Sequence, residues 1–451
     1  MSVLLKSILP VLGKTQLEPG FRSPSQHATQ ETCAPAGKSA ISTIPNEILS
    51  EIFVAYSQSQ VHSVWDVKEG PRLLETICTL WRDITISSPR VWSSFAVVAE
   101  EDTGCSKMVS ALQIYLSRSA SCPLSFTFTS RSMISRSHLL LDVLVSHSDR
   151  WTNVTFDMPL SLYRFLTPIH NRLPLLHSLS LKDTSPFQND GVLTDLNLFQ
   201  FAPRLQKLTL CGFWNTMQDS FPWHQLTFFC DESVQCTTPP DILFSMSHLE
   251  ELIYRPTAKS ILTTPEVHVL PQLKRIRVLS GYHLNAFLDS VSTPSVQEIT
   301  LDDMCFRYET KCVTKILQNL LMRSRACLKM LNIDHLAYGD ASHLLHLFQC
   351  TPHLTTLNIR YWSSPELSKL CRGLVEDRGI LPDLQTLSLQ SDLTTAVYDV
   401  VDLIRYRWRP MSGNGKQLQS VKLSGYPIYD ISSLSSLRRF SEEGLDVCFG
   451  M

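Results

Sequence analysis

The feature that most constrains the fold is a short pattern ending in L-x-x-L-x-L that returns along most of the chain. It usually follows a proline and a short polar step. From Trp151 to Leu418 the first template positions lie 23 to 34 residues apart, except for one gap of 44. We expect that gap, between 210 and 249, to contain one more copy at PWHQLTFF (222–229). The other copies are LPLLHSLSL (173–181), APRLQKLTL (202–210), MSHLEELIY (246–254), LPQLKRIRV (270–278), TPSVQEITL (293–301), RACLKMLNI (325–333), TPHLTTLNI (351–359), LPDLQTLSL (381–389), GKQLQSVKL (415–423) and the degenerate SDRWTNVTF (148–156).

Each copy predicts a short strand, because leucines two residues apart point to the same face of a strand. Leu179 and Leu181 then face inward, while Ser178 and Ser180 face outward. An apolar strand face of this kind is covered only by neighbouring repeats, so the units stack into a solenoid. Periods of about 20–30 residues with this template are typical of leucine-rich repeats. We predict the α/β class, with parallel strands on the concave face of a curved solenoid and helices and loops on its convex face. An ordinary parallel α/β domain would not repeat one register ten times.

The register also predicts which strand residues meet solvent. Leu357 and Leu387 are expected in the core, and Asn358 and Ser388 on the surface. At the outward strand positions, basic residues of one group of repeats lie beside acidic residues of the repeats that follow. One interpretation is that these charges neutralise each other across neighbouring strands; the other is that they select a charged segment of a target protein. The candidate target-binding residues are Arg255, Arg275, Arg277, Glu298, Asp302, Asp334 and Arg360.

Composition excludes several classes of function. The net charge of −2 gives no overall attraction to nucleic acid or to an anionic membrane. No apolar run is long enough to span a bilayer, and the start MSVLLKSILPVLG lacks a clear cleavage site, which disfavours a signal peptide. The thirteen cysteines include no CxxC pair, a pattern typical of reduced thiols in the cytoplasm or nucleus. Cys327 and Cys350 are expected as small core residues.

A second pattern precedes the repeats. In STIPNEILSEIF (42–53) two apolar doublets, Ile48-Leu49 and Ile52-Phe53, lie four residues apart and so share one face of a helix. Pro45 suits the first helical turn. A single second helix is predicted over LLETICTLWRDI (73–84), and PRVW (89–92) predicts one further turn. Helices this short are not stable alone, so they must pack on the rest of the chain, on a partner, or on both.

These residues resemble an F-box, with its L-P-x-E-I-L-x-x-I-F, C-x-x-W and final L-W pattern. Ile44-Pro45, Glu47, Ile48-Leu49 and Ile52-Phe53 match the first part, Cys78 and Trp81 the second, and Val91-Trp92 the last. Ile44 replaces the usual leucine, and the loop after the first helix is longer than in many members. The loop and the following segment are similar to F-box proteins of mushroom-type fungi. The resemblance implies docking on a Skp-type adaptor. The implied adaptor-binding residues are Ile44, Pro45, Ile48, Leu49, Ile52, Phe53, Trp81 and Trp92.

The expected organisation is therefore a small three-helix F-box-like unit followed by the solenoid. Alternatively, the same apolar residues simply pack against Trp81 and Trp92 within the chain. The expected domains are a disordered or weakly ordered tail (1–41), the F-box-like unit (42–95), a connecting segment with a first irregular repeat (96–147) and the solenoid (148–451).

Motifs for catalysis are weak. SGNGKQ (412–417) resembles part of a phosphate-binding loop, but Pro410 stands where the first glycine is needed and Gln417 replaces the Mg²⁺-binding Ser/Thr. His343, His346 and Cys350 share a helical face but lack a fourth ligand. We expect no enzyme activity, no metal and no cofactor. The resemblance implies a substrate-recognition subunit of an SCF-type ubiquitin ligase, which joins a target protein to the Skp-type adaptor and cullin core. The alternative is a leucine-rich-repeat interaction scaffold that recruits no ligase.

Overall fold

The computed structural model divides the chain into two compact units. The first comprises residues 1–193 with 198–204, and the second comprises 194–197 with 205–451. The predicted tail (1–41) lies outside the described residues. The structure describes residues 44–99, 105–131, 137–185, 197–212, 220–233, 238–256, 267–279, 284–302, 310–334, 341–360, 363–377, 379–391, 396–409, 416–424 and 431–450.

The first unit begins with the predicted helical segment. Its elements are α2 (Asn46–Ser59), α3 (Gly70–Ile77), α4 (Thr79–Ser87) and the 3-10 turn η3 (Pro89–Trp92). Pro45 has extended backbone angles and immediately precedes α2, instead of lying in its first turn. The prediction of a single second helix is wrong, because Cys78 is extended (φ −160°, ψ 170°) and separates α3 from α4. This break lets Leu74 and Trp81 both enter the core while Leu80 remains exposed.

The helical segment has its own apolar core. Phe53 of α2 is fully buried and its ring centroid lies 4.8 Å from that of Trp81. Trp92 is also buried, and its indole Nε1 donates a hydrogen bond to the Thr85 carbonyl at 2.8 Å. A buried tryptophan that keeps its hydrogen bond adds apolar contact without an unsatisfied donor. These contacts fix α2, α4 and η3 against one another.

Four parallel strands follow in the first unit, paired in chain order. Large side chains fill the space behind them; Trp92, for example, packs edge-to-face on Tyr115 with centroids 4.9 Å apart. The strands are β1 (Ser94–Ala99), β2 (Leu124–Ser130), β3 (Trp151–Met158) and β4 (Ser178–Asp183). The connecting elements are α5 (Cys105–Arg118), α6 (Ser137–Val145), η4 (Ser148–Arg150) and η5 (Leu160–Ile169).

The loop after α2 joins the helical segment to the first strand. Val64 N–H donates to the Ala96 carbonyl at 2.9 Å, and Ala96 N–H donates to the His62 carbonyl at 2.7 Å. The indole Nε1 of Trp65 donates to the Val98 carbonyl at 3.0 Å. These bonds satisfy backbone groups along the edge of β1 that would otherwise face solvent. The helical segment therefore covers the first strand edge of this unit.

The described residues of the second unit form ten strands of the repeat sheet. They are parallel and follow one another in chain order, as a leucine-rich-repeat solenoid requires. Every template copy that the sequence predicts has a strand, including the copy expected at 222–229. The strands are β5 (Lys207–Cys211), β6 (Phe228–Asp231), β7 (Glu251–Tyr254), β9 (Arg275–Leu279), β11 (Glu298–Asp302), β12 (Met330–Asp334), β13 (Thr356–Arg360), β14 (Thr386–Gln390), β15 (Ser420–Ser424) and β16 (Asp446–Gly450).

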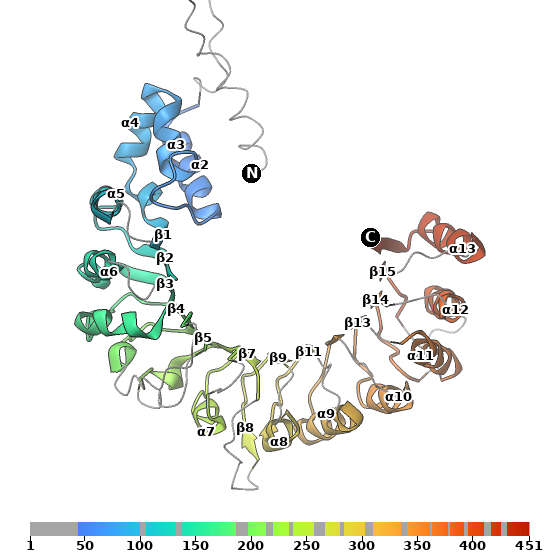
Figure 1. Cartoon of the computed structure of the whole chain (residues 1–451). Helices are drawn as coiled ribbons and strands as arrows, with labels where there is room; N and C mark the ends of the chain where they lie inside the picture. Colours follow the sequence, from blue (N-terminus) through green and yellow to red (C-terminus); the bar gives the residue numbers. More distant parts are fainter. Residues whose placement is uncertain are drawn as a thin grey trace, which may run out of the picture. The chain divides into compact units, whose positions relative to one another are not determined.

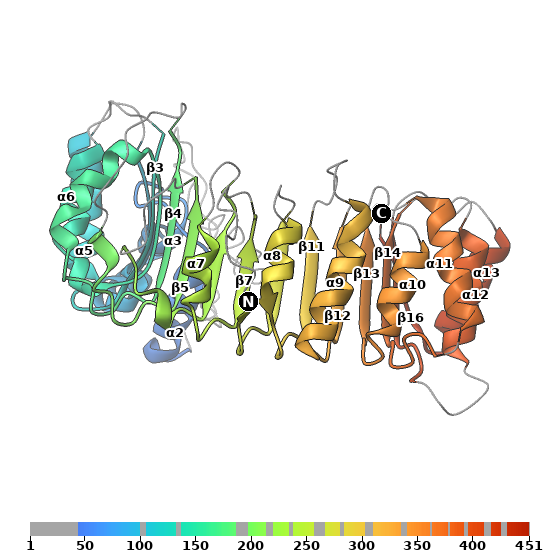
Figure 2. The same cartoon turned by 90° about the horizontal axis from the view of Figure 1, so that it is seen from below.

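Within the second unit the strands lie on the concave side and the helices on the convex side (Figures 1 and 2). A small separate sheet pairs β8 (His268–Val269) with β10 (Val291–Ser292). The 3-10 turn η6 (Asn197–Phe199) precedes β5 and lies where the chain passes between the two units. The convex elements are η7 (Trp223–Gln225), α7 (Pro240–Phe244), α8 (Leu284–Ser290), α9 (Thr310–Ser324), α10 (Ala341–Gln349), α11 (Ser364–Glu376), α12 (Val397–Trp408) and α13 (Ile431–Glu442).

The predicted register is confirmed at its test positions. Leu357 and Leu387 are paired in register and buried. Asn358 and Ser388 lie on the opposite strand face but are half-buried instead of fully exposed, because neighbouring strands crowd each outward position. The expectation for Cys327 is wrong: its side chain is exposed, because the next residue, Leu328, occupies the core position. Cys350 is half-buried.

Candidate functional site

The concave face of the second unit contains an open hollow of about 660 Å³, lined by residues from β7 to β15. In-register pairing places its side chains in rows that run across the strands. We call the central one the middle row; it consists of Ile253, Arg277, Thr300, Asn332, Asn358, Ser388 and Lys422. The first row lies on the N-terminal side of the middle row and consists of Glu251, Arg275, Glu298, Met330, Thr356, Thr386 and Ser420. Met330 and Thr356 belong to this row by register but do not line the hollow.

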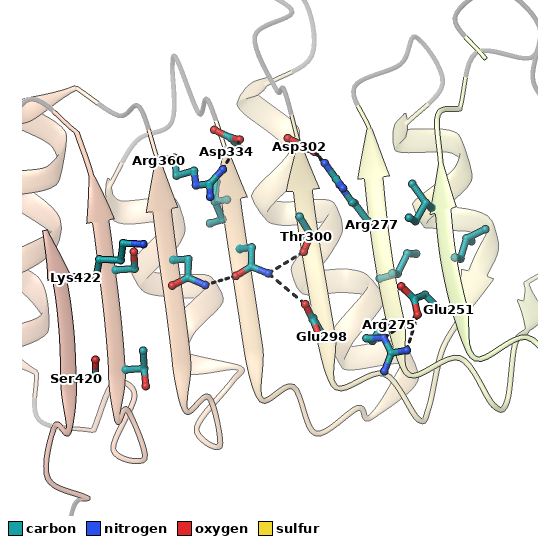
Figure 3. A pocket seen from close by; sticks show the side chains of 18 residues that line it. Glu251, Arg275, Arg277, Glu298, Thr300, Asp302, Asp334, Arg360, Ser420 and Lys422 are labelled. Atoms are coloured by element: carbon teal, nitrogen blue, oxygen red, sulfur yellow. Dashed lines mark hydrogen bonds and ion pairs between the residues drawn. The ribbon is translucent and has the colours of Figure 1, made fainter. Parts of the chain in front are cut away.

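Arginines of the hollow are paired with carboxylates on neighbouring strands (Figure 3). In the first row, Nη2 of Arg275 lies 2.5 Å from Oε2 of Glu251. The hydrogen bond to Glu251, and then the charge of that carboxylate, raise the pKa of Arg275. Arg275 is also in register with Glu298, on the other side. It pairs with only one of its two acidic neighbours, which leaves Glu298 without an ion pair to any described residue.

Two further ion pairs lie at the C-terminal ends of the strands. Nε of Arg277 donates to Oδ2 of Asp302 at 2.8 Å, and its Nη2 contacts the same oxygen. Nη1 of Arg360 lies 3.6 Å from Oδ2 of Asp334. Both carboxylates have side chains only 17% exposed, whereas the arginines are about half exposed. The acidic partners are therefore held in the sheet surface, and the arginines lie over them.

Amide side chains occupy the centre of the hollow. Nδ2 of Asn358 donates to Oδ1 of Asn332 at 2.5 Å, and Nδ2 of Asn332 donates to Oγ1 of Thr300 at 2.8 Å and, more weakly, to Oε1 of Glu298 at 3.4 Å. This chain of hydrogen bonds crosses β13, β12 and β11 (Figure 3). Polar networks of this kind fix the rotamers of their members. The centre of the hollow is thus a pre-ordered polar surface.

The far side of the hollow carries an isolated cation. Lys422 of β15 is exposed and forms no ion pair with the described part of the chain. Its in-register neighbour on β14 is Ser388, and Thr386 and Ser420 belong to the adjacent row. On the other side, its in-register neighbour is Cys448 of β16, and Asp446 of the same strand accepts a hydrogen bond from Ser420 at 2.9 Å. The hollow-lining side chains next to Lys422 on β14 and β15 are therefore hydroxyls.

The structure brings together most of the sequence-predicted target-binding residues. Arg275, Arg277, Glu298, Asp302, Asp334 and Arg360 all line the hollow. Arg255 does not; it follows the last residue of β7 and is half-buried. Lys422 was missed, although the template GKQLQSVKL already places it at an outward position.

A second candidate surface lies on α2 and the residues just before it. We call it the α2 face; it consists of Ile44, Pro45, Ile48 and Ile52. Ile48 is 52% exposed and Pro45 is exposed, while Ile44 and Ile52 are half-buried. Ile48 and Ile52 lie four residues apart in α2 and so share one side of the helix, and Ile44 and Pro45 immediately precede it. The other predicted adaptor-binding residues lie in the core of the helical segment: Leu49, Phe53, Trp81 and Trp92.

Other candidate sites carry little chemistry. His343 and His346 are exposed on α10, while Cys350 accepts a 3.4 Å hydrogen bond from Gln318 Nε2. The described residues contain no group of three or more His, Cys, Asp or Glu side chains arranged to hold a metal ion. SGNGKQ (412–417) lies mostly outside the described residues. None of the described helices has the length and apolar character needed to cross a membrane.

Comparisons with known proteins add little to this picture. The sequence matches no protein-family profile and no curated protein. Among solved structures, the chain is similar to an internalin from Listeria monocytogenes. The sequence identity is 13% and the TM-score is 0.30, over 76% of this chain and 96% of the internalin chain. The assignment as a leucine-rich-repeat solenoid rests on the template and strand register of the chain itself.

Proposed function

We propose that the chain is a protein-interaction scaffold that binds a partner protein in the concave hollow of its second unit. The observation that carries this proposal is the hollow itself, which is lined by fourteen polar or charged side chains from successive strands. Solenoids present extended, rigid concave surfaces of this kind for binding.

Charge balance favours a protein partner over a nucleic acid. The hollow is lined by four cations and four anions, so it presents no net positive field to a polyanion. Alternating charges instead suit a protein surface that carries both signs. The cations are Arg275, Arg277, Arg360 and Lys422, and the anions are Glu251, Glu298, Asp302 and Asp334.

Charge reversal in the hollow tests this function. Arg275→Glu with Arg277→Glu places like charges beside Glu251 and Asp302, so proteins that co-purify with the wild-type chain should be lost. The matched control is Arg372→Glu with Arg405→Glu, which changes two exposed, ion-paired arginines on the convex helices α11 and α12. The control should retain the same proteins. If both double variants retain the co-purified proteins at the wild-type level, with unchanged thermal unfolding, the binding surface lies elsewhere.

A finer function for the first unit is recruitment to an SCF-type ubiquitin ligase. The exposed isoleucine on α2 supports it, together with the resemblance of this segment to an F-box. Full burial of an isoleucine side chain contributes about 1.5–3 kcal/mol, and Ile48 is 52% exposed, so its further burial would contribute roughly half of that to the binding of a Skp-type adaptor at the α2 face. In the competing interpretation, the helical segment serves only as a cap, consistent with its bonds to the edge of β1.

One substitution distinguishes between the two interpretations of the helical segment, recruitment to a ligase and service as a cap only. Ile48→Asp should abolish binding to a purified Skp-type adaptor, because it would bury a carboxylate in an apolar interface. It should leave folding intact, since the side chain already faces solvent. Ile114→Asp is the matched control, an isoleucine 41% exposed on α5 outside the helical segment. If the wild-type chain does not bind the adaptor, or if Ile48→Asp binds it normally, the α2 face is not the docking surface.

A further inference from the structure

The charges of the hollow are not all used within the chain. Three arginines are paired with Glu251, Asp302 and Asp334. Glu298 on β11 and Lys422 on β15 have no ion-pair partner among the described residues. Lys422 is exposed, and Glu298 is half-buried with a long hydrogen bond of 3.4 Å from Asn332. A charge without an ion pair at each end of a polar surface is the arrangement in which opposite charges on a partner gain most, because no internal ion pair has to be broken first.

The distance between these two charges determines how long a bound segment must be to reach both. β11 and β15 are four strand spacings apart, since β12, β13 and β14 lie between them. At about 4.8 Å per spacing this is about 19 Å. An extended chain rises about 3.3 Å per residue, so about six residues cover the distance.

The surface between the two charges suits a peptide backbone. Asn358 donates its Nδ2 hydrogen to Asn332, while its Oδ1 accepts no hydrogen bond from any described residue. The hydroxyl of Ser388 likewise has no hydrogen-bond partner in the described ranges. An extended segment exposes N–H and C=O groups along both edges, and such acceptors and donors can satisfy them.

The size of the hollow limits what enters it. A volume of about 660 Å³ lies in the range of small-ligand sites, far below a folded domain. The part of the partner that enters is therefore a short segment. Few apolar side chains line the hollow, so polar complementarity has to supply the specificity.

We infer that the hollow binds an extended segment of its partner that carries a basic side chain at Glu298 and an anionic group at Lys422, about six residues apart. This inference rests on the proposed protein-binding function and specifies its ligand. The anionic group is a carboxylate or a phosphate, since hydroxyls beside an ammonium group serve either.

Synthetic peptides test the inference with the full chain. The probes are fluorescein-labelled peptides of serine, threonine and alanine that carry one arginine and one glutamate about three, six or nine positions apart, in both orders. A second set replaces glutamate with phosphoserine. We expect the six-residue spacing, in one order, to bind at least about tenfold more tightly than the others. Tighter binding of the phosphoserine set identifies a phosphate as the anionic group, and equal or weaker binding identifies a carboxylate.

Charge-reversal variants test whether the two ends of the peptide bind at Glu298 and Lys422. Glu298→Lys and Lys422→Glu should each weaken binding of the preferred peptide about tenfold or more, and the double variant should prefer the opposite order. Glu376→Lys and Lys329→Glu are the matched controls, because both residues are exposed and lie outside the hollow lining; they should bind as the wild type does. Restored binding by the double variant excludes misfolding as the cause.

Two outcomes would overturn the inference: no peptide binds at any spacing, or binding ignores both the spacing and the two reversals. If co-purified proteins are still lost in the Arg275→Glu, Arg277→Glu variant, the protein-binding function stands while this ligand assignment fails. If that variant also retains all its partners, the function assigned to the hollow fails as well.

Discussion

The α2 face and the concave hollow are opposite kinds of surface. On α2, each apolar doublet divides between solvent and core: Ile48 is exposed while Leu49 is buried, and Ile52 is half-buried while Phe53 is fully buried. In the hollow, the strands also divide between core and surface, but the outward side chains that line it are all polar or charged except Ile253.

This difference implies two modes of binding. An apolar face gains free energy by burial, at about 25 cal/mol per Å² removed from water, with little demand on geometry. A pre-paired polar surface gains only where a partner matches its charges and hydrogen bonds. The α2 face therefore suits a constant partner held by contact area, and the hollow suits selection among partners. Substitutions and thiol labelling can test whether exposed and buried side chains are divided in this way in each region.

Thiol reactivity should show the largest difference, and it also tests where the hollow ends. Cys230 lies on β6, in register with Ile253 of the middle row, yet it is buried. Burial, more than its acidic neighbours, raises the pKa of this thiol to about 12. Alkylation followed by mass spectrometry should modify Cys230 at least about 10³-fold more slowly than the exposed Cys78. Equal rates would mean that the hollow extends across β6.

Truncation on α2 should separate its two sides. Phe53→Ala removes a fully buried ring that packs on Trp81, and should lower the free energy of unfolding by about 3–5 kcal/mol. Ile48→Ala removes an exposed side chain and should cost less than about 0.5 kcal/mol. Chemical denaturation measures both. Comparable losses would show that Ile48 is packed within the chain, and the α2 face would then have no free anchor.

The repeat strands should show a smaller contrast between adjacent residues. Leu357→Ala empties a core position and should cost about 2–5 kcal/mol. Asn358→Ala removes the hydrogen bond to Asn332 at a half-buried position, and should cost about 1 kcal/mol. The same denaturant series reports both values. A larger loss from Asn358→Ala than from Leu357→Ala would mean that the register is shifted by one residue.

The sequence predicts the repeat sheet well, because the template specifies both the strand and its inward side. Once parallel strands pair in register, the rows of the hollow follow from the sequence alone. A first irregular repeat was expected within 96–147, but the strands β1 and β2 were not placed, because SFAVVA and LSFTFTS use aromatic and β-branched residues where the template has leucine. Their alternating burial shows that period-two patterning was the available signal.

Other features depend on tertiary contacts that spacing does not determine. Arg275 has an acidic neighbour in register on each side, Glu251 and Glu298, and the sequence does not favour either. The break at Cys78 likewise separates two segments with continuous helical spacing. The division of each α2 doublet between core and surface depends on where Trp81 packs, which no local pattern specifies.

The smallest expected effect concerns the ion pairs of the hollow. Arg277 and Asp302 pair on neighbouring strands, with side chains 47% and 17% exposed, so water and salt screen their attraction. A double-mutant cycle of Arg277→Ala and Asp302→Ala should give a coupling free energy of about 0–1 kcal/mol in unfolding experiments, decreasing with added salt. The same Arg277→Ala variant should nevertheless weaken partner binding, because the arginine guanidinium can also hydrogen-bond acidic groups of a partner. A large, salt-independent coupling with unchanged partner binding would mean that the pair serves the sheet alone. The hollow would then not act as a polar recognition surface, and only the α2 face would remain as a candidate binding surface.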